Sequence, residues 1–232
     1  MNAQGAIQLA LEAGRVFTPA SPVSDSDLFA GRRQQLDRLA QVVAQVGQHA
    51  LIFGERGVGK TSLANVFAAL LRDQAATLAA RVNCDSSDDF ASVFRKVFSE
   101  IQIKETQQRI GFEAKPEERF TTYADNLPGA LTPHLSRRVL EEIARQIGLV
   151  VIIDEFDRIG PRHATTFADF IKSLSDHAVP CTLLFVGVGS SVSDLIAGHQ
   201  SVERALVQVP MPRMSRAELT DILDRGLQPE RA

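Results

Sequence analysis

The chain has 232 residues, of which 44% are hydrophobic and 23% charged, a composition that can bury a core and excludes intrinsic disorder. Its net charge of −3 excludes a protein that coats nucleic acid through bulk positive charge. Every apolar run is far shorter than the ~18 residues of a membrane span, and the N-terminus lacks the pattern of a secretory signal. We therefore expect a cytoplasmic protein that does not contact membranes.

The N-terminal 25 residues are interpreted as an arm, with a helix-like stretch at 6–16 followed by Pro19 and Pro22, which favour extended backbone. Apolar residues then recur at steps of three and four from Leu36 to Val46, so a first core helix is predicted over 34–46. Two cysteines, Cys84 and Cys181, lie far apart without a CxxC or Cys/His cluster. We expect both to be buried, rather than a disulfide or a zinc site.

From residue 49 onward, short apolar runs alternate with amphipathic stretches. Strands are predicted at 50–53, 78–82, 149–153, 182–186 and 205–209, and helices at 61–72, 89–103, 136–147, 163–178 and 215–226. This alternation indicates a three-layer α/β fold with a mostly parallel, five-stranded sheet. The polar stretch 104–133 has weak periodicity and is interpreted as an insertion or a mobile connection.

A glycine-rich turn joins the first predicted strand to the helix that follows. Its sequence, Gly54-Glu55-Arg56-Gly57-Val58-Gly59-Lys60-Thr61 and then Ser62, matches GxxxxGK[ST]. Glycines let successive backbone N–H groups converge on phosphate oxygens, and the helix N-terminus favours negative charge. We expect Lys60 to bridge the outer phosphates and the Thr61 hydroxyl to bind Mg²⁺.

An acidic pair, Asp154 and Glu155, ends the apolar strand 149–153, at the strand end where open α/β sheets bind ligands. Asp154 can complete the shell of a Mg²⁺ ion, and Glu155 can polarise a water for attack on a γ-phosphate. The alternative for an acidic pair alone is a helix-start cap. Asp157, three residues after Asp154, is interpreted as a solvated or capping residue.

Together these motifs resemble the Walker A and Walker B motifs of P-loop ATPases, in the branch with an extra strand between the two motif strands and a catalytic glutamate. The segment Phe29-Ala30-Gly31-Arg32-Arg33 before a helix is similar to the FxGR segment of AAA+ ATPases of the origin-recognition and STAND-like groups. The resemblance implies that Arg32 borders the adenine pocket.

The resemblance also suggests two further residues. Ser190, after the strand at 182–186, matches the polar sensor 1 position, with an ordinary helix N-cap as the alternative. Arg204 lies where family members carry an arginine that reaches a neighbour's γ-phosphate, with a solvated arginine as the alternative.

The implied organisation is an N-terminal arm (1–25), an AAA+ P-loop core (26–212) and the start of a truncated helical lid (213–232). The lid helix begins with an N-cap serine, Ser215, and Glu218 in capping-box position. The sequence contains neither an NKxD-type guanine loop nor an LSGGQ-like signature, which disfavours GTPases and ABC ATPases. The acidic pair suits water activation better than phosphoryl transfer to a second substrate, which disfavours small-molecule kinases.

Two functions follow from these motifs. The first is an ATP- and Mg²⁺-dependent ATPase that switches conformation or assembly for a macromolecular partner, with self-association through a shared ATP site. The second is a STAND-like module that binds ATP or ADP without turnover and controls an effector protein. DNA is a candidate partner, with contacts from Arg32-Arg33, Arg137-Arg138 and the segment 158–162; solvated arginines are the alternative.

Overall fold

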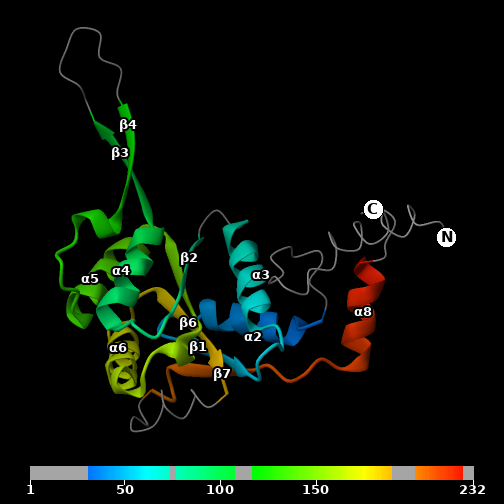
Figure 1. The fold of residues 1–232 in the computed structure, drawn as a ribbon. Coiled ribbons are helices and arrows are strands. Elements are labelled where there is room, and N and C mark those ends of the chain that lie inside the picture. The colour runs from blue at the N-terminus through cyan, green and yellow to red at the C-terminus, as the bar shows by residue number, and fades with distance from the viewer. Residues whose placement is uncertain (1–30, 74–76, 108–116, 190–201, 227–232) are drawn as a thin grey trace, which may run out of the picture.

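The computed structural model describes residues 31–73, 77–107, 117–189 and 202–226. Its main sheet has five parallel strands in the order β2-β5-β6-β1-β7 (Figure 1). The strands are β1 (His49–Gly54), β2 (Thr77–Asn83), β5 (Gly148–Asp154), β6 (Cys181–Val188) and β7 (Leu206–Pro210). The predicted α/β class and five-stranded sheet are confirmed. Strand β6 lies between β1 and β5, so an extra strand separates the two motif strands, as expected.

Helices cover both faces of this sheet (Figure 1). Side chains from α2 (Arg33–Val43) and α3 (Lys60–Arg72) pack on one face, and those from α4 (Phe90–Glu100), α5 (Pro133–Ala144) and α6 (Ala164–Asp176) pack on the other. Along β5, Val150 and Ile152 belong to the hydrophobic cluster with α2 and α3, while Val151 and Ile153 belong to the cluster with α4, α5 and α6. Successive strand residues point to opposite faces, so a central strand must be apolar at every position.

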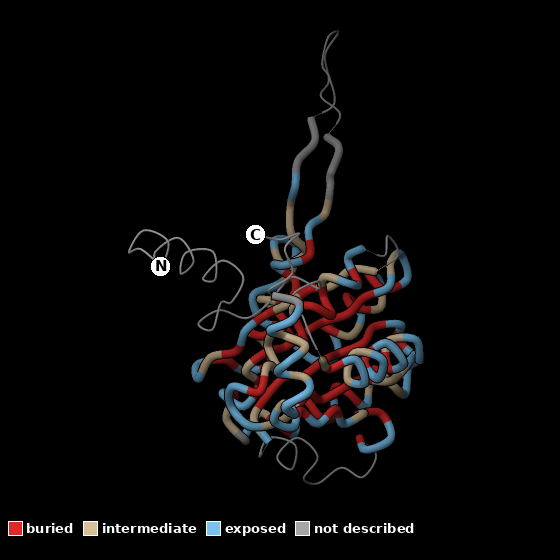
Figure 2. Tube along the Cα trace, turned by 90° about the vertical axis from the view of Figure 1, so that its right-hand side faces the viewer, coloured by how far each residue is buried: buried red, intermediate tan, exposed pale blue. Residues whose placement is uncertain are grey.

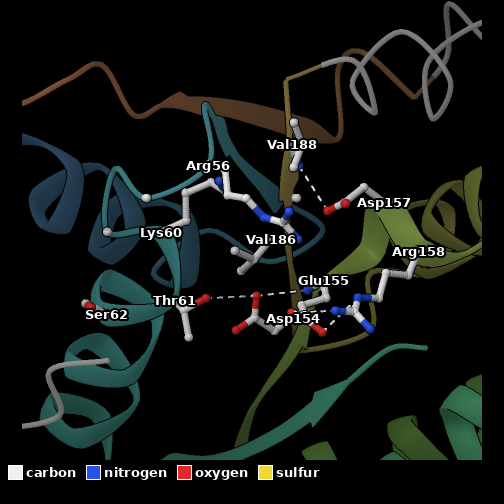
Figure 3. A pocket seen from close by; sticks show the side chains of 13 residues that line it. Arg56, Lys60, Thr61, Ser62, Asp154, Glu155, Asp157, Arg158, Val186 and Val188 are labelled. Carbon is white, nitrogen blue, oxygen red and sulfur yellow. Dashed lines mark hydrogen bonds and ion pairs between the residues drawn. The ribbon is translucent and has the colours of Figure 1, made fainter. Parts of the chain in front are cut away.

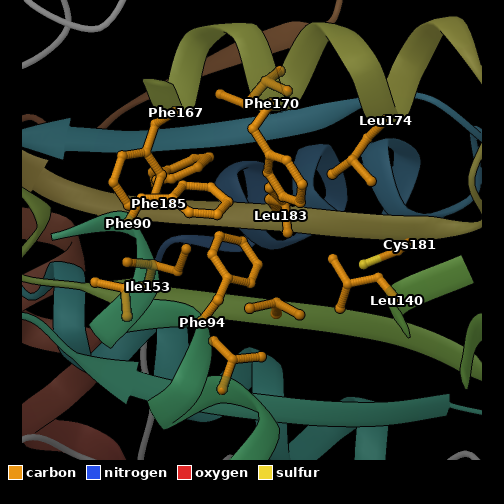
Figure 4. Close-up of a cluster of buried hydrophobic side chains, with 14 of the residues drawn as sticks. Phe90, Phe94, Leu140, Ile153, Phe167, Phe170, Leu174, Cys181, Leu183 and Phe185 are labelled. Atoms are coloured by element: carbon orange, nitrogen blue, oxygen red, sulfur yellow. The ribbon is translucent and has the colours of Figure 1, made fainter. Parts of the chain in front are cut away.

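An aromatic cluster fills the layer between the sheet and α4 and α6 (Figure 4). The rings of Phe94 and Phe170 meet edge to face with centroids 4.7 Å apart, and Phe156 meets Phe185 at 4.9 Å. Such arrangements place a ring edge against a ring face, which the aromatic quadrupole favours. Phe156 follows the acidic pair directly and is 4% exposed, so the core anchors the chain just beyond Asp154 and Glu155.

The polar stretch after α4 differs from the prediction. The expected helix over 89–103 ends at Glu100, Ile101 is extended, and β3 (Gln102–Gln107) pairs antiparallel with β4 (Glu117–Thr122). This hairpin extends away from the buried sheet (Figure 2). Its sequence is polar at almost every position, so no apolar alternation marked it as a strand pair.

Other element boundaries shift only slightly. Helix α2 ends at Val43 rather than Val46, because the chain turns at Gly47, which has a φ of +82°. Helix α8 (Arg216–Gly226) begins with the predicted capping box: Ser215 N–H donates to Glu218 Oε2 at 2.7 Å, and Glu218 N–H donates to Ser215 Oγ at 3.2 Å.

Both cysteines are buried free thiols, as predicted, and burial raises the pKa of Cys84 to about 12. Among the described residues, no helix is long and apolar enough to cross a membrane.

One buried titratable side chain, His49, stands at the start of β1. Its Nδ1 accepts a hydrogen bond from the Leu183 N–H at 3.0 Å, which leaves the proton of the neutral ring on Nε2, where it has no partner. Burial lowers the pKa of His49 from 6.5 to about 3. The folded protein therefore holds this imidazole neutral at every pH near 7.

This histidine should make the protein less stable in mild acid. Between pH 6.5 and pH 3 the unfolded chain binds a proton at residue 49 that the folded chain excludes, so stability is lost as the pH falls through that window. We expect the free energy of unfolding to fall by about 1.4 kcal/mol more in wild type than in His49→Asn between pH 7.5 and 5.5. Asparagine keeps a hydrogen-bond acceptor but does not titrate. Urea denaturation of both proteins at the two pH values measures the difference. An equal change in the free energy of unfolding for wild type and His49→Asn would contradict the prediction.

Candidate phosphate-binding site

The glycine-rich turn follows β1 and leads into α3. At Gly57 and Gly59 the φ angles are +83° and +89°, a backbone region that side chains rarely adopt, and a Cβ at either position would meet no atom within 4 Å. Gly54 is different, because a Cβ there would lie 2.4 Å from the Met211 carbonyl oxygen. The turn therefore needs glycine for its shape at 57 and 59, and for close backbone packing at 54.

Gly54→Ala should destabilise the fold as well as the turn. The Met211 N–H donates to the Phe53 carbonyl at 2.7 Å, so the colliding backbone is held by the β1 edge and has little freedom to move. We expect the free energy of unfolding to fall by roughly 3 kcal/mol. Gly129→Ala is the matched control, since its Cβ meets nothing within 4 Å. Equal urea midpoints for the two variants would contradict this account of Gly54.

The Lys60 ammonium folds back over the turn. Its Nζ donates to the Gly54 carbonyl at 3.0 Å and to the Glu55 carbonyl at 2.8 Å. Burial lowers the pKa of Lys60, while Asp157 and Asp154 raise it. The amine is thus held over the loop that would surround a phosphate group, and two carboxylates favour its charged form.

The Thr61 hydroxyl and the Asp154 carboxylate meet below the turn (Figure 3). Thr61 Oγ1 donates to Asp154 Oδ1 at 3.4 Å, although 93 residues separate them in the chain. The same carboxylate oxygen accepts the Glu155 N–H at 2.8 Å. The structure therefore brings together the two residues that the sequence predicts as Mg²⁺ ligands.

Glu155 and Asp157 line the same site with different partners. Glu155 has left-handed backbone (φ 55°, ψ 34°), and its Oε2 lies 3.1 Å from Arg158 Nε. Asp157 Oδ1 accepts the Val188 N–H at 3.1 Å and so ties the loop after β5 to the end of β6. Asp157 is exposed, as expected of a solvated residue, and its link between two strand ends adds to that interpretation.

These groups surround a cavity of about 310 Å³ at the carboxyl ends of β1, β5 and β6 (Figure 3). Its lining includes the predicted Arg56, Gly57, Gly59, Lys60, Thr61, Ser62, Asp154 and Glu155. A second cavity of about 480 Å³ lies between the turn and α8, with Val58, Met214 and Leu219 in its wall. Glu55 lies in this wall too, and its Oε2 pairs with Arg213 Nη2 at 2.7 Å.

Arg32 is buried behind the turn rather than open to the cavities. Its side chain is 1% exposed, and its Nη2 donates to the Val58 carbonyl at 3.3 Å and to the Pro212 carbonyl at 2.6 Å. Nη1 lies 3.9 Å from Glu218 Oε1 on α8. Arg32 thus joins the turn to the helix that follows β7. Its burial excludes it from the set of arginines proposed to touch DNA.

The resemblance alone suggested roles for Ser190 and Arg204. Ser190 lies outside the described residues. Arg204 is exposed, in the turn at 202–205 that precedes β7. The roles of both remain predictions.

Sequence reasoning missed Arg81, which reaches the acidic pair from β2. Arg81 Nη2 lies 2.8 Å from Asp154 Oδ2 and also donates to Asn83 Oδ1 at 3.2 Å. The register of β2 and β5 places Asn83 opposite Asp154 and Arg81 opposite Ile152. A single arginine within the otherwise apolar run 78–82 was the available signal, because a charge inside a buried sheet needs a partner.

The residues present fit a nucleoside triphosphate with Mg²⁺. Among the described residues no group of three or more His, Cys, Asp or Glu side chains could hold a metal ion. Mg²⁺ in phosphate sites takes only one or two protein oxygens and completes its shell with water and phosphate. The Thr61 hydroxyl and Asp154 carboxylate match that donor set, and the open space at Gly57 and Gly59 lets phosphate oxygens approach the backbone.

Comparison with known proteins agrees with this geometry. The model of a family described as AAA ATPase domain matches residues 28–186. No curated protein matches the sequence.

Three solved structures are similar. A Walker-type ATPase of Pyrococcus abyssi has a TM-score of 0.60 at 15% identity, over 89% of this chain and 60% of its own. The Orc1 protein of Aeropyrum pernix in complex with DNA has a TM-score of 0.56 at 17% identity, over 92% of this chain and 52% of its own. Cdc6p of Pyrobaculum aerophilum has a TM-score of 0.56 at 18% identity, over 92% of this chain and 53% of its own. The chain spans about half the length of Orc1 and Cdc6p, and at these identities the likeness shows the fold alone.

Proposed function

Because the chain belongs to the AAA ATPase domain family, we propose that it binds ATP with Mg²⁺ at the turn 54–61 and hydrolyses it to switch a macromolecular partner. One observation carries the proposal. The Thr61 hydroxyl and the Asp154 carboxylate lie 3.4 Å apart beneath a glycine turn, in a cavity that also holds Lys60 and Glu155. Nucleotide hydrolysis uses a pair of metal ligands, a cationic side chain that binds the phosphates and a general base, and this cavity contains all three kinds of group.

Each residue has one task in this proposal. Lys60 leaves the Gly54 and Glu55 carbonyls to neutralise the outer phosphates, and the backbone N–H groups of the turn hold the remaining phosphate oxygens. Thr61 and Asp154 hold Mg²⁺, which supplies charge neutralisation on the phosphate oxygens when bound. Glu155 accepts the proton of the attacking water.

The second cavity is suited to the nucleotide base. It lies on the other side of the turn from Asp154, and its wall combines the apolar side chains of Val58, Met214 and Leu219 with the polar pair of Glu55 and Arg213. Ligand pockets commonly combine an apolar lining with a few polar groups. Adenine in this cavity would contact α8, so nucleotide binding would act on the orientation of that helix.

The switch itself requires a second site or a second molecule. Ser190 would sense the γ-phosphate, and Arg204 would reach the nucleotide of a neighbouring subunit, which is consistent with its exposure. The partner would be DNA or an effector protein. The similar Orc1 structure is a complex with DNA, and Arg33, Arg138, Arg158 and Arg162 are exposed here.

A second candidate function is nucleotide binding without turnover, as a switch for an effector protein. The pairing of Glu155 with Arg158 favours it, because both Nε and Nη2 of Arg158 lie against the carboxylate that would act as base. A carboxylate held by a guanidinium is less free to contact an attacking water. In this alternative the nucleotide stabilises one conformation and phosphate is not released.

Phosphate release from Mg·ATP by the purified chain, over a series of protein concentrations and with or without double-stranded DNA, separates the two functions. Turnover per subunit that rises with concentration supports an ATPase with a shared site. Stimulation by DNA identifies the partner class. ATP binding with no phosphate release at any concentration supports the binding module.

A further inference from the structure

Arg81 is the only described arginine side chain paired with Asp154. Its Nη2 is 2.8 Å from Asp154 Oδ2, and the carboxylate is only 3% exposed. The Arg81 side chain is 26% exposed, and its Nε is buried without a hydrogen-bond partner. A planar guanidinium with a buried, unused donor is held here by the charge of Asp154 rather than by a complete set of hydrogen bonds.

The two oxygens of Asp154 are divided between separate tasks. Oδ1 faces the phosphate site, where it contacts the Thr61 hydroxyl and the Glu155 N–H. Oδ2 faces β2, where it is bound by Arg81. On the cavity side, Asp154 and the Lys60 ammonium attract each other. Arg81 therefore neutralises the Asp154 carboxylate from the β2 side, while Oδ1 of Asp154 remains directed at the phosphate site.

We propose that Arg81 is a positioning residue that sets the affinity of the site for its divalent cation, a proposal that rests on the proposed function. The guanidinium keeps the Asp154 carboxylate oriented in the absence of a metal, and its positive charge opposes the approach of a second cation to the same carboxylate. The site then binds a metal weakly unless the phosphate groups of a nucleotide add negative charge. Metal and nucleotide are thereby made to bind together.

The direction of the effect distinguishes this role from a purely structural one. If Arg81 only tied β2 to β5, its removal would loosen the sheet and weaken every ligand. If Arg81 opposes the cation, its removal takes one positive charge from beside a buried carboxylate, and the metal binds more tightly. We expect the Mg²⁺ concentration at half-saturation of ATP binding to fall about fivefold or more in Arg81→Gln.

The experiment is a Mg²⁺ titration of fluorescent ATP binding to wild type, Arg81→Gln, Arg81→Lys and Arg72→Gln. Arg72, exposed in the last turn of α3, gives the same change in net charge at the opposite end of that helix from Thr61. Arg81→Lys keeps the charge and should stay near the wild-type Mg²⁺ requirement. A parallel titration with Mn²⁺ alone, followed by electron paramagnetic resonance, reads the cation site without nucleotide. Thermal melting confirms folding, and Arg81→Met, which keeps an apolar stem, replaces Arg81→Gln if that variant does not fold.

Tighter Mg²⁺ and Mn²⁺ binding in Arg81→Gln, with Arg72→Gln unchanged, supports the proposal. An unchanged or higher Mg²⁺ requirement in a folded Arg81→Gln overturns it and leaves Arg81 a structural tie. If wild type binds no ATP, the proposed function fails, while the Mn²⁺ titration still reports whether Arg81 opposes the cation.

Discussion

Lys60→Ala is expected to weaken the binding of Mg·ATP by about a hundredfold or more. The wild-type ammonium is held over the turn by the Gly54 and Glu55 carbonyls, at 3.0 and 2.8 Å, and exchanges these hydrogen bonds for phosphate oxygens when the nucleotide binds. Alanine removes that charge, and water would have to replace charge-assisted hydrogen bonds to the phosphates. Isothermal titration with ATP in excess Mg²⁺ measures the loss.

Lys172→Ala is the matched control, because Lys172 is exposed on α6 and its removal changes the net charge by the same amount. Its ATP affinity should equal that of wild type. Thermal melting in the absence of nucleotide should show that Lys60→Ala is folded. Equal ATP affinities in wild type and Lys60→Ala would refute the assignment of the turn as a phosphate site.

Glu155→Gln should keep ATP binding and slow hydrolysis by roughly 10²–10⁴-fold. Glutamine has the same size and can still contact Arg158, and both residues must adopt the left-handed backbone at this position. The substitution therefore removes the proton acceptor with little change in structure. Single-turnover phosphate release from bound ATP measures the rate of the chemical step directly.

Glu142→Gln, at an exposed position of α5, is the control for the change in charge and should hydrolyse ATP at the wild-type rate. A wild-type rate in Glu155→Gln would exclude Glu155 as the base. A wild-type protein that binds ATP but releases no phosphate would instead favour the binding module, in which Arg158 holds Glu155 in its ion pair.

The sequence alone was sufficient to predict the strands of the main sheet and the glycine-rich turn. Strand β5 was predicted because a strand buried on both faces must be apolar at each position, and 149–153 is apolar throughout. The turn was predicted because its glycines and its Lys60-Thr61 pair are consecutive in the chain. Its position between a strand and a helix is likewise a local property.

Two polar features had no such local signal. The hairpin of β3 and β4 was missed, because a ribbon with polar residues throughout carries no apolar period. Arg32 was expected at the border of a nucleotide pocket, and its burial against Val58, Pro212 and Glu218 depends on where α8 packs.

Chain-local patterns therefore determined the strands of the main sheet and the position of the glycine-rich turn, since backbone preference and burial act over a few neighbouring residues. Only the tertiary structure decided which charges face one another in the site. The pairing of Arg81 with Asp154 joins residues 73 positions apart and depends on the register of two parallel strands, which no short stretch of sequence encodes. The charge around the acidic pair, and with it the proposed control of metal binding, is thus a property of the fold.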